Sequence, residues 1–169
     1  MPNFLNIREL KERLHITFDD DDLLLQGYID AAESYLGDPV NGVLHRPVLA
    51  QDFVERFARF DDVCLAFPDE VTEVSVSYVD AEGAERPLGE IFTVENGCLL
   101  LKHGENWPQA RSVTVSYRAG WDPHAVPSAI REAGYFIARS LYEQGDQIDQ
   151  NRFRSVVAFK IAGFRRATL

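Results

Sequence analysis

Cysteine is scarce in this sequence, and the two that are present, Cys64 and Cys98, form no recognisable motif. Both are flanked by apolar residues, in VCLAF and GCLLL, and their separation matches no zinc or redox spacing. We therefore expect two buried free thiols in a reducing compartment.

The sequence also lacks a long apolar run. No uninterrupted stretch approaches the ~20 apolar residues that a membrane-spanning helix needs, and the first residues, MPNFLNIREL, contain no apolar signal region. We therefore expect neither a membrane-bound nor an exported protein. A hydrophobic content of 46% is too high for a disordered chain. We expect residues 1–150 to form a single domain, followed by a separate C-terminal segment, residues 151–169.

Positive charge is scarce over most of the chain. The whole sequence has 17 basic and 27 acidic side chains, yet residues 151–169 contain five basic ones and no acid. Residues 1–150 therefore carry a net charge of about −15, and the terminal segment about +5. An acidic body repels nucleic acid, whereas the terminal segment can bind an acidic partner. On charge alone, an ordinary solvated terminus is an equal alternative.

Catalytic and metal-binding motifs are missing as well. The histidines are scattered, and the one suggestive segment, His103–Glu105, lacks the paired cysteines that complete a zinc deaminase site. The run Asp19–Asp22 does not continue as a calcium loop, because Leu24 replaces the required glycine and Asp30 the required glutamate. We therefore predict no catalytic, cofactor-binding or metal-binding residues and no enzyme. An enzyme whose site is assembled from dispersed residues is the alternative.

Helical periodicity occurs on both sides of the middle of the chain. At the start of the longer N-terminal helix, Asp19 is expected to cap the helix, and Phe18 and Leu23 to pack together as a hydrophobic staple. The C-terminal helix has a continuous face of apolar and small side chains, which indicates close packing on another helix. The predicted helices cover residues 7–14, 19–36 and 126–144.

Between these helices the apolar period changes to two residues, which is typical of β-strands. Two connections have hairpin signals: DAEGAE, which contains Gly83, and the dipeptide Asn96-Gly97. We therefore predict an α+β fold: a small bundle of three main helices with an inserted, mostly antiparallel sheet over about residues 50–118, and an extended or short-helical tail. The predicted strands cover residues 52–60, 62–67, 71–79, 91–94, 98–101 and 113–118.

Five segments, taken in order, resemble the head-tail connector proteins of tailed phages, also called adaptor or head-completion proteins, which also occur in prophages and gene transfer agents. The segments are ITFDDDDLLLQGYIDAAESYL, VTEVSVSYVDAEGAERPL, ENWPQARSVTVSYRAGW, VPSAIREAGYFIARSLYEQ and FKIAGFRRATL. Together they cover most of the chain from about residue 7 onward. The last segment departs from the family, which often has a proline and a tyrosine where this chain has Gly163-Phe164-Arg165-Arg166.

The resemblance implies a structural role without a cofactor. About twelve copies would form a homo-oligomeric ring between the portal protein and a downstream tail or stopper protein. The ring would lie in the neck of a virion or virus-like particle assembled in the bacterial cytoplasm, away from any membrane. An acidic channel would let DNA pass without specific binding. The expected portal or partner interface is Arg152, Phe153, Arg154, Lys160, Phe164, Arg165 and Arg166.

Two points stay open at this stage. Another neck or tail-completion module with a similar layout is an alternative to the connector. The sequence also does not distinguish a phage from a gene transfer agent.

Overall fold

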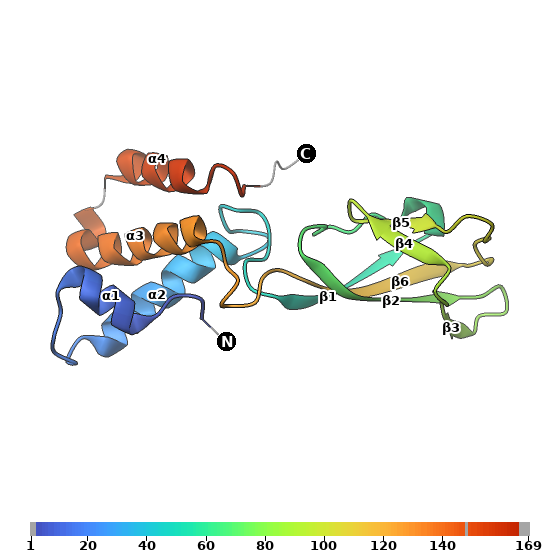
Figure 1. Cartoon of the computed structure of the whole chain (residues 1–169), viewed down its shortest axis with the longest axis horizontal. Helices are drawn as coiled ribbons and strands as arrows, with labels where there is room; N and C mark the ends of the chain where they lie inside the picture. Colours follow the sequence, from blue (N-terminus) through green and yellow to red (C-terminus); the bar gives the residue numbers. More distant parts are fainter. Residues whose placement is uncertain (1–2, 148, 166–169) are drawn as a thin grey trace. The chain divides into compact units, whose positions relative to one another are not determined.

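The computed structural model describes residues 3–147 and 149–165. The chain forms two compact units: one contains the residues up to Leu49 and from Trp121 onward, and the other is Ala50–Gly120. The first unit holds the α-helices and the second holds the strands (Figure 1). The predicted α+β class is therefore confirmed.

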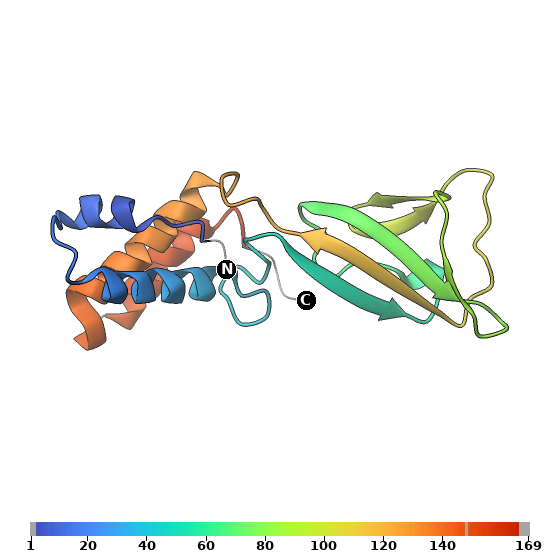
Figure 2. The ribbon, with the colours of Figure 1, turned by 90° about the horizontal axis from the view of Figure 1, so that it is seen from below.

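Helix α3 is the centre of the helical unit, because it packs against each of the other three helices (Figure 2). Its buried face contains small residues, as expected from the sequence: Ala133 and Ser140 belong to the predicted face, and Gly134 and Ala138 add to it. At Gly134 a Cβ would lie 2.8 Å from Leu5 Cδ1, so a side chain there would require the Leu5 side chain to move. The four helices are α1 (Ile7–Leu14), α2 (Asp22–Gly37), α3 (Ser128–Gln144) and α4 (Gln150–Ile161).

The start of α2 differs from the prediction. Asp21 is the residue before the helix and makes no side-chain capping hydrogen bond, so the predicted cap by Asp19 is wrong. The carboxylates of Asp19 and Asp22 instead accept hydrogen bonds from Lys11 Nζ at 2.6 and 2.7 Å. Because the lysine of α1 draws both carboxylates toward it, the acidic run joins α1 to α2 and does not cap the helix.

The second unit contains a four-stranded antiparallel sheet with the order β1-β6-β2-β3, and a separate ribbon of β4 and β5. The central strand β6 alternates as predicted: Val113, Val115 and Tyr117 are buried and the residues between them are partly exposed. Its buried side shares a core cluster with Leu99 of β5. The strands are β1 (Gln51–Phe57), β2 (Val71–Val79), β3 (Glu85–Pro87), β4 (Phe92–Glu95), β5 (Cys98–Leu101) and β6 (Ser112–Ala119).

Both predicted hairpins are confirmed. In the β4–β5 turn, Asn96 and Gly97 have φ angles of 50° and 78°, the left-handed conformation that an Asn-Gly turn provides. In the β2–β3 turn, Asp80 accepts hydrogen bonds from the Ala84 backbone N–H at 2.8 Å and from Arg86 Nε at 2.5 Å. The hydrogen bond from Arg86 is the main reason that the pKa of Asp80 lies below its usual range.

The prediction of a strand at residues 62–67 is wrong. A short 3₁₀ helix, Phe60–Asp62, ends at the first residue of this segment, and Cys64 then forms a single bridge with Cys98. The prediction of two buried free thiols is also wrong, because these cysteines form a disulfide, with Cys64 exposed and Cys98 partly buried. Backbone hydrogen bonds from Leu65 N to Gly97 O and from Leu99 N to Val63 O hold the two cysteines opposite each other.

Candidate interaction surface on helix α4

Helix α4 carries most of the residues predicted to form a partner interface. It begins after Asp149, whose carboxylate accepts hydrogen bonds from the backbone N–H groups of Asn151 at 3.0 Å and Arg152 at 3.2 Å. Lys160 lies in the last turn, where a positive charge faces the negative end of the helix dipole. Of the two conformations expected for the C-terminal tail, the helical one is therefore found.

One face of α4 packs on the helical unit. Val157 and Ile161 are buried in its core. The Phe153 ring contacts Tyr35 of α2, with ring centroids 6.1 Å apart, and Phe136 of α3 at 5.9 Å. Phe153, predicted from the sequence as an interface residue, therefore attaches α4 to its own chain.

The residues after α4 are attached in a similar way. The Phe164 ring meets Trp121 edge-on, with centroids 6.4 Å apart, and the Arg46 guanidinium lies 4.2 Å from the centre of the same indole ring. Phe164 is partly buried, so it too holds the terminal segment against the helical unit. Phe153 and Phe164 are thus anchors, whereas Arg152, Arg154 and Arg165 are exposed.

The opposite face of α4 is exposed and basic. Arg152 is exposed there, and Phe159 is 85% exposed. Arg154 is exposed as well, but it lies three residues before Val157 and therefore on the side of the helix that lines a groove. The sequence prediction omitted Phe159, although its spacing indicates its position: it lies two residues from both Val157 and Ile161, hence on the other side of the helix. The role of these residues in binding stays a prediction, and Arg166 lies outside the described residues.

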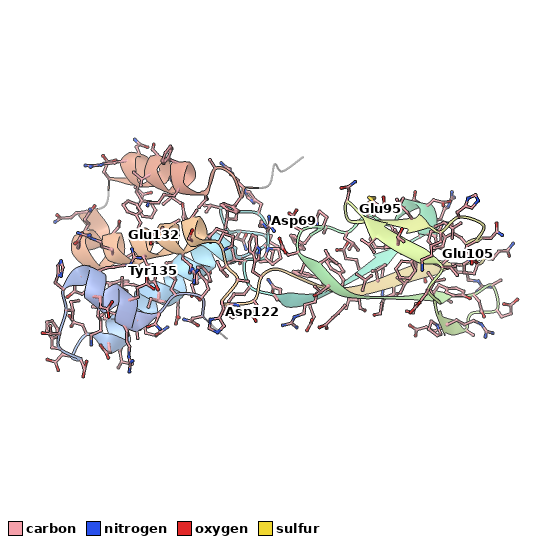
Figure 3. The ribbon with its side chains drawn as sticks, viewed as in Figure 1. Asp69, Glu95, Glu105, Asp122, Glu132 and Tyr135 are labelled. Carbon is pink, nitrogen blue, oxygen red and sulfur yellow. A yellow bond between two sulfur atoms is a disulfide. The ribbon has the colours of Figure 1, made fainter. Side chains whose placement is uncertain are left out.

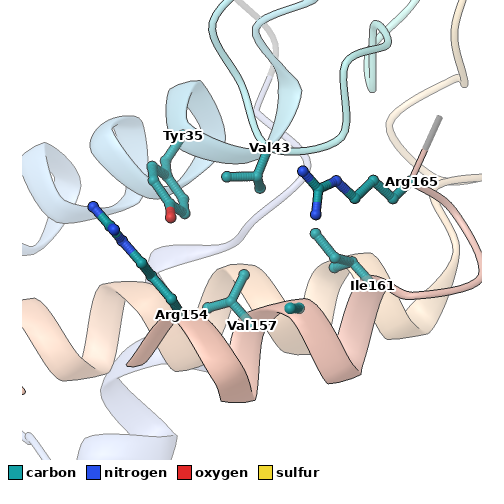
Figure 4. A pocket seen from close by; sticks show the side chains of 7 residues that line it. Tyr35, Val43, Arg154, Val157, Ile161 and Arg165 are labelled. Carbon is teal, nitrogen blue, oxygen red and sulfur yellow. The ribbon is translucent and has the colours of Figure 1, made fainter. Parts of the chain in front are cut away.

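A groove of about 330 Å³ separates α4 from the last turns of α2 and the loop that follows them. Val157, Ile161 and Val43 form its apolar floor, and Arg154 and Arg165 lie at its two ends (Figure 4). No ion pair joins either arginine to an acidic side chain in the described part of the chain. We call these residues, with Tyr35 and Ala158, the α4 groove.

Several of the perturbed ionisable groups of the helical unit, among them Glu132 and Tyr135, belong to a structural network between α1 and α3 (Figure 3). Arg13 donates to Glu132 at 2.6 Å and to Glu9 at 2.7 Å, and it stacks on the Tyr135 ring. Its hydrogen bond is the main cause of the lowered pKa of Glu132. Burial raises the pKa of Tyr135 to about 12. Since every member has a partner, this network is suited to joining helices rather than to exchanging protons.

A second exposed surface lies at the N-terminal end of α2, whereas Tyr35 of the α4 groove is near the C-terminal end of the same helix. Leu23 is 92% exposed and Phe18 is 49% exposed, so the predicted staple between them is wrong. The reason is the later start of the helix, which leaves Leu23 in its first turn and turns Leu25, fully buried, toward the core. Residues 18–24, named here the α2 start segment, contain three of the seven large apolar side chains that are exposed among the described residues.

None of the described helices is long and apolar enough to cross a membrane. In residues 3–147 and 149–165, His, Cys, Asp and Glu side chains do not gather in groups of three or more that could hold a metal ion.

Comparison with known proteins agrees with the connector resemblance. A family model described as phage gp6-like head-tail connector protein matches residues 5–81, which include the helices α1 and α2 and the strands β1 and β2. The predicted resemblance to the head-tail connector proteins is confirmed. No curated protein matches the chain in a sequence comparison.

Solved structures share the fold of this chain over nearly its whole length. A chain from the virion of a native gene transfer agent (GTA) particle is 20% identical with a TM-score of 0.67, over 96% of this chain and 90% of that one. A chain from the neck of an empty GTA particle, computed with sixfold symmetry, is 17% identical with a TM-score of 0.66 and the same coverage. A chain from the neck of a native GTA particle, computed with twelvefold symmetry, is 19% identical with a TM-score of 0.62, over 96% and 89%. At these identities the likeness shows a common fold.

Proposed function

We propose that this protein is a structural component of the neck of a phage-like or gene-transfer-agent particle. In this role, about twelve copies form a ring that binds the portal protein on one side and a tail or stopper protein on the other. One observation carries the proposal: the fold similar to chains of GTA particle necks extends over 96% of this chain. The sixfold and twelvefold symmetry of those particles favours a cyclic assembly.

The charge distribution supports a channel for DNA. Residues 1–150 have a net charge of about −15, and a ring multiplies this charge around its axis. DNA would then pass through the channel without adhering to it, since like charges repel over the distances of a pore. We infer assembly in the bacterial cytoplasm, followed by a permanent position in the neck of the particle.

The exposed face of α4 is the proposed portal-binding surface. Arg152 supplies positive charge, and Phe159, seven residues further on the same side of the helix, supplies exposed apolar area. Lys160, which is partly buried, adds positive charge in the last turn. An exposed aromatic side chain near cations is typical of a protein interface. Phe153 and Phe164 contribute indirectly, because they hold this face in place.

A structural role also agrees with the chemistry of the described residues. The carboxylates with lowered pKa values, such as Glu9 and Glu132, are held by Arg13, within α1 and between α1 and α3 respectively, and do not line the α4 groove. We therefore propose no enzymatic reaction. Another neck or tail-completion module with this fold is the second candidate, and it differs from the first in the partner that is bound.

Imaging by electron microscopy of the full chain mixed with its portal protein tests the proposal. We expect a ring of this protein on one end of the portal, and a charge reversal at Arg152 together with Phe159→Ser should abolish that binding. Arg8→Glu, a charge reversal at an exposed residue of α1, is the matched control and should bind normally. A ring that caps a tail component and never the portal would favour the second candidate, and a protein that binds neither would refute the proposal.

A further inference from the structure

We propose that the α4 groove of one copy receives the α2 start segment of a neighbouring copy, so that copies join head to tail. The inference rests on the proposed function, because a ring requires one contact that repeats around the axis. It adds the two surfaces that make this contact, which the neck role alone does not specify.

The chemistry of the α4 groove indicates what it can bind. Its floor is apolar, and Arg154 and Arg165 place one guanidinium group at each end (Figure 4). A volume of about 330 Å³ accepts a few side chains, near the lower limit of roughly 300 Å³ for small-molecule pockets. The complementary ligand is an apolar side chain with carboxylates beside it, since an arginine binds a carboxylate through two parallel hydrogen bonds.

The α2 start segment has this pattern. Leu23 projects almost completely into solvent, and Phe18 and Leu24 are each about half exposed. Asp20 is exposed and makes no ion pair with a described residue, so its carboxylate is available to a guanidinium group of another molecule. Apolar side chains gathered on a surface in this way are typical of a protein contact.

The two surfaces cannot meet within one molecule. The α2 start segment is at the first turn of α2, whereas Tyr35 of the α4 groove is near its last turn. Twelve residues of continuous helix between Leu23 and Tyr35 correspond to a separation of about 18 Å. A contact between opposite ends of the same rigid helix therefore joins two copies. Such a contact is heterologous, and it closes into a ring when the rotation between neighbours divides a full turn.

Charge favours a second copy as the occupant. The groove contributes two positive charges, and the α2 start segment contributes the carboxylate of Asp20 beside Asp19, which Lys11 of the same molecule already binds. Because both surfaces occur on every copy, each molecule offers one groove and one complementary segment. Their pairing would cover the most exposed apolar side chain of the described chain, Leu23.

Complementary charge reversals test the contact through sedimentation velocity at low salt. We expect Arg154→Glu and Asp20→Arg each to weaken self-association about tenfold or more, because like charges would then face each other. An equimolar mixture of the two variants should associate again. In that mixture, the native groove of the Asp20→Arg variant can bind the native segment of the Arg154→Glu variant. The altered groove and the altered segment can also pair, through a salt bridge of reversed polarity. Arg152→Glu, the same change on α4 outside the groove, should not alter self-association.

Photocrosslinking in assembled particles provides a second measurement that does not require association in isolation. With p-benzoylphenylalanine in place of Leu23, we expect crosslinks to residues 155–165 of another copy, identified by mixing isotopically labelled and unlabelled protein. Crosslinks to another segment, or to a different protein of the particle, would overturn the contact and leave the neck role intact. Failure of the unmodified protein to enter particles would instead count against the proposed function itself.

Discussion

The two phenylalanines of α4 that lie six residues apart are expected to respond very differently to replacement by alanine. Phe153 packs on Tyr35 and Phe136, whereas Phe159 is 85% exposed. The substitutions Phe153→Ala and Phe159→Ala remove the same atoms from the same helix. Any difference between them therefore measures the packing of α4 on its own chain.

The magnitude follows from the area that the Phe153 ring removes from water. A phenylalanine buries roughly 150–250 Å² when fully enclosed, and about half of that at about 25 cal/mol/Å² gives about 2–3 kcal/mol. Its two ring contacts add to this, so we expect Phe153→Ala to lower the free energy of unfolding by about 3 kcal/mol. For Phe159→Ala we expect a change within about 0.5 kcal/mol, as for other exposed positions.

Urea denaturation monitored by circular dichroism measures the global effect, and amide hydrogen exchange locates it. Because α4 is at the edge of the helical unit, the lost energy should appear first as local opening of α4. A loss of about 3 kcal/mol corresponds to exchange roughly 100-fold faster in residues 154–161. Equal effects of the two substitutions, or a larger effect of Phe159→Ala, would refute the assignment of the inner and outer faces.

Three further changes test other parts of the structure. Leu10→Ala should cost about 2–5 kcal/mol in urea denaturation, because Leu10 is fully buried among all the helices of its unit; a cost below 1 kcal/mol would contradict this core. The hydrogen bond from Arg86 lowers the pKa of Asp80 in the folded state. It therefore stabilises the β2–β3 turn fully at pH values above the unfolded-state pKa of about 4, and this stabilisation is lost as the pH falls through the lower pKa of the folded state. The protection of amides in this turn, measured relative to their intrinsic exchange rates at each pH, should therefore fall on acidification in the wild type, and Asp80→Asn should remove that pH dependence. Cys98→Ser should lower the free energy of unfolding by up to about 4 kcal/mol under oxidising conditions, on a loop-entropy estimate, and by much less in the presence of a reductant.

The regular elements of the fold could be predicted because their side chains are periodic. The helix over residues 7–14 is found with the same bounds, and α3 begins only two residues after its predicted start. The turn at Asn96-Gly97 was predictable as well, because both residues readily adopt a positive φ angle. In each case the information lies within a few neighbouring residues.

The errors occur where a distant residue decides the local structure. Asp19 had the right identity and position for a helix cap, but Lys11 of another helix binds its carboxylate. Cys64 and Cys98 show no pairing signal in the sequence, because only the hydrogen bonds between their neighbours bring them together. The interface role predicted for Phe153 and Phe164 stays a prediction, but the sequence did not show that both rings pack against their own chain, since this depends on how α4 lies on its neighbours.

The two points at which the chain leaves and re-enters the helical unit allow the length of the β insert to vary. The chain leaves the helices at Leu49 and returns at Trp121, and these two residues are bridged, with Trp121 N–H donating to Val48 O at 2.8 Å. Since the two crossing points are neighbours, an insert of almost any length can start and end there without moving a helix. A short glycine-rich link in place of residues 50–120 would close the helical unit on itself, and a longer β insert would extend the molecule while its helices stay unchanged. Homologous particles could therefore differ in the size of this insert and still keep the same helical bundle.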